Sequence, residues 1–353
     1  MTDAIFINGR RIGKNQPVYI VAEMSGNHDQ DFNKAVKIIE AAKESGADAV
    51  KLQTYTSDTI TIDCDNEYFR IKGTIWEGRN LYDLYGEAFT PWDWQPRLKK
   101  IADTLGLDLF STPFDLTAIE FLEQMDVPAF KIASFENSDI PLIKAIAKTG
   151  KPIIMSTGMS TLADIDEAVR TVRGTGNDQL ALLKCTSAYP APPEEMNLLT
   201  IPHLAEAFQV PVGLSDHTLG SAVAVASVAH GACIVEKHFT LSRNDPGPDS
   251  SFSMEPIEFE AMVRDIRTVE AALGQPSYGI TEREKSSVVF KRSLFVVRDM
   301  AEGDSFTMDN VRSIRPGYGL HPRYLDTVLK GCAGRDLKKG TPLAWDMIRE
   351  FSI

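Results

Sequence analysis

The 353-residue sequence lacks paired cysteines, long apolar runs and an excess of positive charge. Its four cysteines are scattered and form no CxxC pair, so neither a disulfide framework nor a thiolate zinc site is indicated. No apolar run approaches the ~18 residues that a membrane span needs, and the N-terminus lacks the basic flank and apolar stretch of a secretory signal. The formal net charge of -12 argues against a nucleic-acid partner and an anionic membrane surface. These absences predict a cytoplasmic globular protein with no nucleic-acid or membrane partner.

Short apolar, β-branched runs recur along the chain, and amphipathic helical patterns such as Phe32–Ser45 lie between them. The eight runs are Val18–Ala22, Ala49–Leu52, Leu107–Phe110, Ala129–Ala133, Pro152–Met155, Leu180–Lys184, Val210–Leu214 and Ala232–Val235. Near-continuous apolar strands that alternate with helices are typical of a parallel sheet buried on both faces. Eight such units in about 250 residues favour an α/β fold of the (β/α)8 TIM-barrel type. No GxGxxG motif follows the first run, so dinucleotide binding is not indicated.

The pattern changes after Leu273, where Gly and Pro punctuate short strand-like pieces such as Ser293–Val297 and Val311–Ile314. We therefore predict a barrel domain over residues 1–280, a linker over 281–291 and a small strand-rich domain over 292–353.

The connection after the second predicted strand, Thr54–Ala88, is unusually long. Long loops in compact domains are usually functional or disordered. This connection carries large aromatic residues, among them Tyr68, Trp76, Tyr82 and Tyr85, which argue against disorder. We expect it to form a lid or a wall of the substrate site.

Polar side chains close each predicted strand at the same end. In barrel enzymes the active site is built at the C-terminal ends of the strands. The residues there include Glu23, Lys51, Gln53, Thr112, Lys131, Ser134, Ser156, Ser187, Tyr189, Ser215, His217, Glu236 and His238. Their convergence predicts a polar pocket that can bind an anion.

His217 and His238 close neighbouring strands, which lie about 4.8 Å apart in a sheet. Two imidazoles on one rim can bind a divalent cation, with water and substrate oxygens as the other ligands; Mn²⁺ suits this set, and Mg²⁺ or Co²⁺ are alternatives. Glu236 could bind the ion or act as a base, and Asp216 could orient His217. The other interpretation is a hydrogen-bonded pair of rim histidines.

Lys51 and Lys131 also end strands, and Ser134, Ser156 and Ser215 lie near them in the predicted rim. Two ammonium groups with several hydroxyl donors suit a phosphate or a carboxylate. A Schiff-base lysine is the competing interpretation, because barrel aldolases use a strand lysine.

Three residues receive less specific roles. Glu23 is expected to act as a general acid or base or to bind a sugar hydroxyl, and a structural carboxylate is the alternative. Asn27 is expected to cap a helix. Lys237 alternates away from the pocket along its strand and is expected to be structural.

Eight stretches match a known family: Ile20–His28, Val50–Tyr55, Ser111–Phe114, Phe130–Ser134, Met155–Met159, Lys184–Pro190, Gly213–Thr218 and Val235–Phe239. With these stretches the chain resembles the sialic acid synthase family over nearly its full length. The segment around Ser313–Gly317 is similar to the antifreeze-like (SAF) domain that follows the barrel in that family. The resemblance implies a metal-dependent condensation of phosphoenolpyruvate with an acylated amino sugar. It also implies a homodimer in which the SAF domain covers the partner's active site.

The resemblance further implies roles for individual residues. Lys51, Thr112, Lys131, Ser134, Ser156, Ser187 and Ser215 would hold phosphoenolpyruvate. Gln53, Tyr189, Asp249 and Arg315 would face the sugar, with Arg315 reaching across the dimer. Glu23, Glu236 and Lys51 would take part in catalysis, and His217 and His238 would bind the metal.

Four further stretches resemble the branch of the family that acts on 2,4-diacetamido-2,4,6-trideoxyaltrose: Ile71–Trp76, Leu81–Tyr85, Thr90–Trp94 and Gly319–Pro322. Ser187 and Ser250 depart from the residues usual in N-acetylneuraminate-forming enzymes, which commonly act on N-acetylmannosamine. An N-acetylneuraminate- or legionaminate-forming enzyme is the alternative within the family. A Schiff-base aldolase and a carbohydrate- or ice-binding protein are the alternatives outside it.

Overall fold

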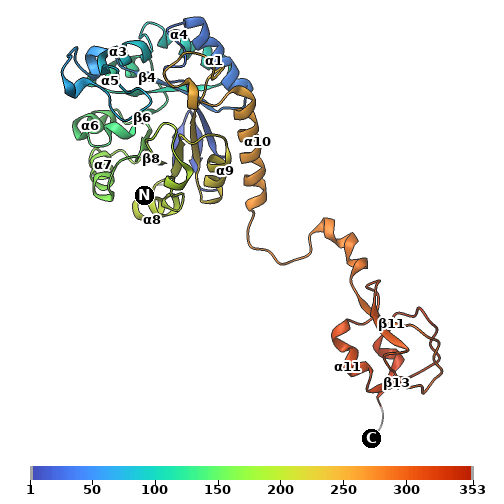
Figure 1. Ribbon diagram of the computed structural model, residues 1–353. Helices are drawn as coiled ribbons and strands as arrows, with labels where there is room; N and C mark the ends of the chain where they lie inside the picture. Colours follow the sequence, from blue (N-terminus) through green and yellow to red (C-terminus); the bar gives the residue numbers. More distant parts are fainter. Residues whose placement is uncertain (1–2, 351–353) are drawn as a thin grey trace. The chain divides into compact units, whose positions relative to one another are not determined.

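The computed structural model describes residues 3–350. The chain divides after Gly274 into two compact units, and each has its own architecture. Eight parallel strands of the first unit form a closed barrel in the order β10-β3-β4-β5-β6-β7-β8-β9 (Figure 1). They are β3 Tyr19–Glu23, β4 Ala49–Thr54, β5 Asp108–Pro113, β6 Phe130–Ile132, β7 Ile153–Ser156, β8 Leu180–Cys185, β9 Val212–Asp216 and β10 Ile234–His238. The predicted (β/α)8 barrel is confirmed.

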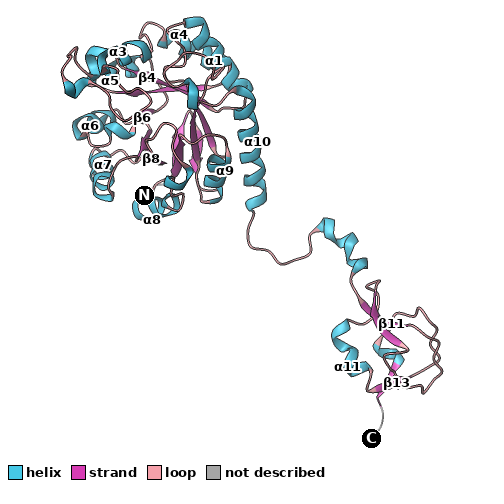
Figure 2. Cartoon of the chain, in the orientation of Figure 1, coloured by secondary structure: helices cyan, strands magenta, loops and turns pink. Residues whose placement is uncertain are grey.

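Helices surround the barrel strands, which Figure 2 shows at the centre of the unit. They are α1 Phe32–Glu44, α4 Gln95–Thr104, α5 Leu116–Gln124, α6 Ile140–Lys148, α7 Leu162–Gly174, α8 Thr200–Phe208, α9 Ala222–Ala229 and α10 Pro256–Leu273. The first is typical: Asp31 caps its N-terminus, and Ala35, Ile38, Ile39 and Ala42 form its buried face. Helix α8 was not predicted, because Pro202 interrupts the apolar spacing of its first turn.

Several strands extend further than their apolar runs predicted. Strand β4 continues to Thr54 because its pairing with β5 is unbroken, with Lys51 opposite Phe110 and Gln53 opposite Thr112. The polar residues expected after the strand therefore lie within it. A residue that belongs to a hydrogen-bonded ladder has its direction set by strand alternation, so these side chains are held more rigidly than loop residues.

An antiparallel hairpin precedes the barrel and was not predicted. It pairs β1 (Ala4–Ile7) with β2 (Arg10–Gly13) through Asn8 and Gly9, which both have positive φ. This is the two-residue turn that an Asn-Gly pair favours. The hairpin's isoleucines are fully buried and share one apolar cluster with residues of the barrel strands.

The predicted lid, which connects β4 to α4, contains α2 (Ser57–Ile60), a short 3₁₀ turn at Glu67–Phe69, and α3 (Leu81–Ala88). This 35-residue connection contains helical structure, in agreement with the prediction from its aromatic content that it is not disordered. No helix among residues 3–350 combines the length and apolarity that crossing a membrane requires.

The second unit is strand-rich, as predicted. It pairs β11 (Ser293–Val296) with β12 (Val311–Ile314), and β13 (Gly331–Ala333) with β14 (Ile348–Glu350). A short helix, α11 (Leu325–Val328), packs on this unit's own apolar core. A 3₁₀ helix over Glu282–Phe290 lies within the segment predicted to be a linker.

Candidate active site

A cavity of about 470 Å³ lies among the carboxyl ends of the barrel strands and the lid. It brings together most of the residues predicted from the strand ends and from the family resemblance. Its lining includes Glu23, Lys51, Gln53, Thr112, Lys131, Ser134, Ser156, Tyr189, Ser215, His217, Glu236, His238 and Asp249. Ser187 instead lines a neighbouring hollow, and Arg315 belongs to the second unit, so its predicted approach to the sugar stays a prediction.

Lys51 lies at the centre of the cavity between two carboxylates. Its Nζ is 2.8 Å from Glu236 Oε1 and 3.2 Å from Glu23 Oε2, and all three side chains are nearly inaccessible. The placement follows from strand order, because β3 has β4 on one side and β10 on the other. Burial by itself would lower the pKa of Lys51, but the two carboxylates outweigh burial and raise the pKa. Lys51 therefore stays an ammonium group, which does not favour it as a Schiff-base nucleophile.

Lys131 has a different environment. Its Nζ donates to Ser156 Oγ at 2.6 Å and lies 3.9 Å from Glu236 Oε1. Burial lowers the pKa of Lys131 to about 8, against the opposing attraction of Glu236. A cation that is buried but only weakly paired is available to an anionic ligand.

Glu23 and Glu236 have pKa values shifted in opposite directions. Burial raises the pKa of Glu23 to about 7, with a further contribution from the charge of Glu236. Burial also pushes the pKa of Glu236 upward, but Lys131 and Lys51 outweigh it and lower the pKa to about 2. One carboxyl group can thus carry a proton near neutral pH while the other is ionised, an arrangement that suits acid–base chemistry.

The rings of His217 and His238 lie 5.3 Å apart between centroids, and the Tyr189 ring lies 4.3 Å from that of His217. His217 Nδ1 is 3.0 Å from Thr186 O, which leaves Nε2 available to a ligand. Burial lowers the pKa of His238 well below its usual value, so this ring is a neutral imidazole, and its buried Nδ1 has no partner. Burial would lower the pKa of His217, but the contact with the Cys185 thiol outweighs burial and raises it. His238 as a neutral imidazole and His217 through Nε2 are the nitrogen donors that would fit a divalent cation.

Protein ligands alone do not complete such a site. Within residues 3–350, no group of three or more His, Cys, Asp or Glu side chains is arranged to hold a metal ion. Water or substrate oxygens would have to supply the other ligands, as expected for a catalytic rather than a structural site.

Asp216 does not orient His217, contrary to prediction. Its carboxylate accepts a hydrogen bond from Lys237 Nζ at 2.7 Å and another from the backbone N–H of Thr218. The carbonyl of Thr186 contacts His217 instead. The same contacts show that Lys237 is structural, as predicted from strand alternation.

Unpartnered polar atoms are concentrated in the cavity. Among the residues that the structure describes, seven buried side-chain atoms have no hydrogen-bond partner within the protein. Five of them belong to residues that line the cavity: Thr112 Oγ1, Glu136 Oε2, Glu236 Oε2, His238 Nδ1, and Glu23 Oε2, which does lie in an ion pair with Lys51. Buried polar groups are normally satisfied, so these atoms indicate a site shaped for polar ligands.

A hydrogen-bonded network leads from this centre toward Asp249. Gln53 Nε2 donates to Glu23 Oε1 at 2.9 Å and to Ser25 Oγ at 3.0 Å, and Ser25 Oγ donates to the carboxylate of Asp249. The predicted sugar-facing residues Gln53 and Asp249 are therefore part of one network with Glu23. Ser25 was missed in the sequence because serines are common in turns.

Asn27 does not cap a helix, contrary to prediction. The fully buried side chain donates to Phe239 O and to Ser253 Oγ, both at 2.9 Å. Ser253 Oγ in turn donates to Asp249 O at 2.7 Å. Asn27 thus anchors the loop after β10, which carries Asp249, to the loop after β3.

Glu136 is a cavity residue that was also missed. It lies two residues after Ser134, and burial raises the pKa of its carboxyl group to about 7. An acidic residue so close to a predicted strand end was the available signal. This signal was not recognised because the preceding strand, β6, is only three residues long.

The closed parallel barrel and the polar cavity at the carboxyl ends of its strands define a (β/α)8 barrel enzyme. The model of the NeuB family matches residues 38–278, and the model of the SAF domain matches residues 291–349. The chain therefore belongs to the NeuB family, which confirms the predicted sialic acid synthase resemblance and the predicted SAF domain.

Three proteins with named activities are similar to most of this chain. A pseudaminic acid synthase from Helicobacter pylori is 44% identical, with 94% of this chain and 98% of that protein covered. An N,N'-diacetyllegionaminic acid synthase from Legionella pneumophila is 35% identical, with 97% of this chain and 98% of that protein covered. The crystal structure of an N-acetylneuraminic acid synthetase from Leptospira borgpetersenii matches with a TM-score of 0.73 at 30% identity, covering 82% of this chain and 96% of that one.

Proposed function

We propose that this chain is a pseudaminic acid synthase. It condenses phosphoenolpyruvate with 2,4-diacetamido-2,4,6-trideoxyaltrose and releases phosphate. The observation that carries the proposal is the single cavity in which two buried lysines, two imidazoles and several unpartnered polar atoms meet. The sugar assignment is supported by the 44% identity to the Helicobacter pylori pseudaminic acid synthase.

The proposed reaction forms a bond between C3 of phosphoenolpyruvate and the aldehyde carbon of the open-chain sugar. Water adds at C2, and phosphate leaves with the bridging oxygen, so that one water is consumed for each phosphate released. The phosphoenolpyruvate anion would bind near Lys131, whose ammonium group is weakly paired, with Lys51, Ser134, Ser156 and Ser215 around it. Thr112 Oγ1, buried and unpartnered, is a further candidate for this anion.

The metal belongs to the proposal as well. His217 and His238 would hold a divalent cation, for which Mn²⁺ is our first candidate and Mg²⁺ or Co²⁺ are alternatives. When bound, such an ion would supply Lewis-acid polarisation of the sugar's aldehyde oxygen. The neutral ring of His238 needs no deprotonation to act as a ligand.

We assign the proton transfers to the carboxyl groups of Glu23 and Glu236. Glu23, with its pKa raised to about 7, would donate a proton or hold a sugar hydroxyl, and the ionised Glu236 would accept a proton. Their separation by Lys51 allows both states to coexist.

We further propose that the enzyme is a cytoplasmic homodimer. Phosphoenolpyruvate is produced in the cytoplasm, which supports the location. The SAF domain would cover the partner's cavity, and Arg315 would contact the sugar's acyl group there. Family membership supports this arrangement.

The test compares the two sugars in an assay of phosphate release. We expect turnover with 2,4-diacetamido-2,4,6-trideoxyaltrose and little with N-acetylmannosamine, and loss of turnover after thorough chelation. Preferred use of N-acetylmannosamine, or of the legionaminate precursor, would reassign the sugar. Full turnover in the chelated enzyme would contradict the metal role.

A further inference from the structure

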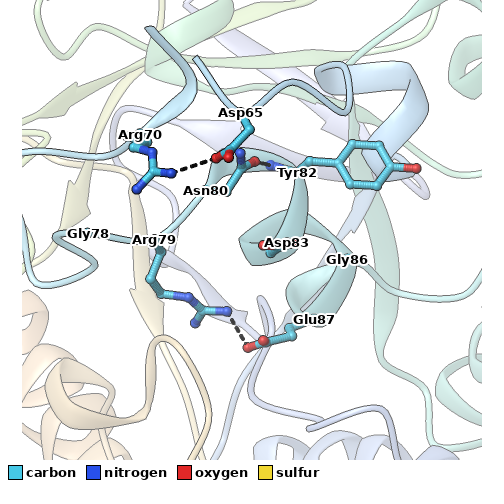
Figure 3. Close-up of a pocket in the computed structure, with 9 residues that line it drawn as sticks. All are labelled: Asp65, Arg70, Gly78, Arg79, Asn80, Tyr82, Asp83, Gly86 and Glu87. Carbon is cyan, nitrogen blue, oxygen red and sulfur yellow. Dashed lines mark hydrogen bonds and ion pairs between the residues drawn. The ribbon is translucent and has the colours of Figure 1, made fainter. Parts of the chain in front are cut away.

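The lid has two chemically different faces. Helix α3 divides by helical spacing: Leu81, Leu84, Tyr85 and Ala88 line the catalytic cavity. The residues between them, Tyr82, Asp83, Gly86 and Glu87, line a second hollow, shown in Figure 3. Positions i, i+3, i+4 and i+7 share one side of a helix, so α3 presents an apolar stripe to the substrate cavity.

None of the ten charged residues of the lid lines the catalytic cavity, and five of them line the second hollow. Arg70 pairs with Asp65 at 2.7 Å, and Arg79 pairs with Glu87 at 2.6 Å, as Figure 3 shows. Each arginine that lines this hollow therefore already has a carboxylate partner. The face of the lid toward this hollow is thus charged, whereas the face toward the substrate cavity carries no charged residue.

Six apolar residues form the surface that we call the lid face: Ile60, Ile71, Trp76, Leu81, Leu84 and Ala88. Trp76 is its anchor, because its Nε1 donates to Pro248 O at 3.0 Å and its ring lies 5.7 Å from the ring of Tyr189. The indole's one polar atom is thus already used within the protein. Trp76 offers the cavity only apolar surface, and it ties the lid to the loop that carries Asp249.

The barrel strands and the lid contribute different chemistry to one cavity. The strands supply carboxylates, ammonium groups, hydroxyls and imidazoles, whereas the lid supplies the lid face together with Thr74 and the two tyrosines Tyr55 and Tyr85. The aldehyde end of the sugar must approach the polar groups that react with it. A hydroxyl at the other end, placed against the lid face and away from Thr74 and Tyr85, would lose its hydrogen bonds to water without replacement. A methyl group there would be stabilised by burial.

We infer that the lid face selects sugars that are deoxygenated at C6. The C6 methyl group contacts this surface. The inference rests on the proposed function, which sets the sugar's orientation, and adds to it the residues that determine specificity. An apolar surface discriminates against one added hydroxyl by about 10- to 100-fold, so we expect the wild-type preference in this range.

The test measures kcat/KM for 2,4-diacetamido-2,4,6-trideoxyaltrose and for its 6-hydroxy analogue, which differ by one oxygen atom. Trp76→Ala should reduce the preference for the 6-deoxy sugar about tenfold, with the KM for phosphoenolpyruvate unchanged. Ile71→Thr, a smaller change that tests the lid face without removing its anchor, should reduce the preference in the same direction. Tyr68→Ala is the matched control, because Tyr68 lies in the same segment, is 82% exposed and lines neither hollow of the lid.

Two kinds of result would overturn the inference, and a third would contradict the proposed function. A wild-type enzyme that uses both sugars equally would show that the lid face does not select. If Trp76→Ala and Ile71→Thr reduce kcat/KM equally for both sugars, the lid only closes the cavity. A parallel rise in the KM for phosphoenolpyruvate would lead to the same conclusion. A wild-type enzyme that releases no phosphate with either sugar would contradict the proposed function itself, a result distinct from the other two.

Discussion

At the scale of single residues, the cavity holds carboxyl groups that are unfavourable for folding. Burial raises the pKa of Glu136 to about 7, whereas the ordinary value is about 4.5. The folded state therefore binds this proton more tightly than the unfolded state does. The stability that the protonated group contributes is fully present below pH 4.5 and is lost as the pH rises through 7. Such groups are retained at functional sites at the expense of stability.

Glu136→Gln removes the ionisable group with little change of shape. We expect the variant to be about 1–3 kcal/mol more stable than the wild type at pH 8, with little difference at pH 4.5. Urea unfolding at both pH values measures this difference. The exposed Glu120→Gln serves as the control. A stability difference that does not change with pH would show that the Glu136 carboxyl is not perturbed by burial.

His238 is the residue on which the proposed metal most depends. His238→Ala should remove at least 90% of bound Mn²⁺ and abolish turnover, and the far-ultraviolet circular dichroism should remain that of a folded barrel. Metal content after gel filtration measures the first effect. His203→Ala, a change at an exposed histidine of α8, should leave both metal content and turnover unchanged. Retention of the metal by His238→Ala would place the ion elsewhere.

At the scale of elements, the loop after β10 is held by one buried amide. Asn27→Ala would leave Phe239 O and Ser253 Oγ without their partner, at a cost of about 1–3 kcal/mol. We also expect the KM for the sugar to rise, because Asp249 lies in this loop, while the KM for phosphoenolpyruvate stays the same.

Asp31→Ala is the matched comparison for Asn27→Ala. It removes the N-cap of α1, at a cost of about 1 kcal/mol, without touching the loop that carries Asp249. Thermal unfolding and steady-state kinetics on both variants separate the two effects. A similar rise in the sugar KM for both variants would mean that lost stability alone changes binding.

The barrel and most of its site could be predicted because they depend on local patterns. Apolar runs that recur eight times predict the strands, and barrel closure brings residues as distant in sequence as Lys51 and Glu236 to 2.8 Å. The ends of the strands and the residues of the site could be predicted without knowing which side chains contact each other. Strand alternation alone sets the direction in which these side chains point.

Features that depend on partners could not be predicted in this way. Asn27 precedes a helix and has the residue type of a cap, but its partners Phe239 and Ser253 lie more than 200 positions away. Asp216 is adjacent to His217 in sequence, yet its carboxylate binds Lys237 of the next strand. In both cases the side chain forms a hydrogen bond with a residue distant in sequence instead of the local contact that its sequence position favours.

At the scale of the whole molecule, the proposed dimer makes a prediction about shared sites. If Arg315 acts across the dimer, Arg315→Ala and His238→Ala enzymes are each impaired, but a hybrid dimer contains one intact site. Mixing the two variants after reversible dissociation should restore about a quarter of wild-type activity, because half of the dimers are hybrids and each has one of two sites. Phosphate release measures the recovery.

No recovery in a mixture whose subunit exchange is verified by mass spectrometry would mean that Arg315 serves its own subunit. An Arg315→Ala enzyme with wild-type kinetics would remove Arg315 from the site altogether. Both results would leave the chemistry assigned to the barrel cavity unchanged.

The most direct test of the central claim is the product itself. The purified enzyme is incubated with phosphoenolpyruvate, 2,4-diacetamido-2,4,6-trideoxyaltrose and Mn²⁺, and the mixture is analysed by mass spectrometry alongside a phosphate assay. We predict one product whose mass is the sum of the sugar and pyruvate, formed in equal amount to the phosphate released. Phosphate release without this product, or a sugar or pyruvate adduct trapped on Lys131 by borohydride, would contradict it.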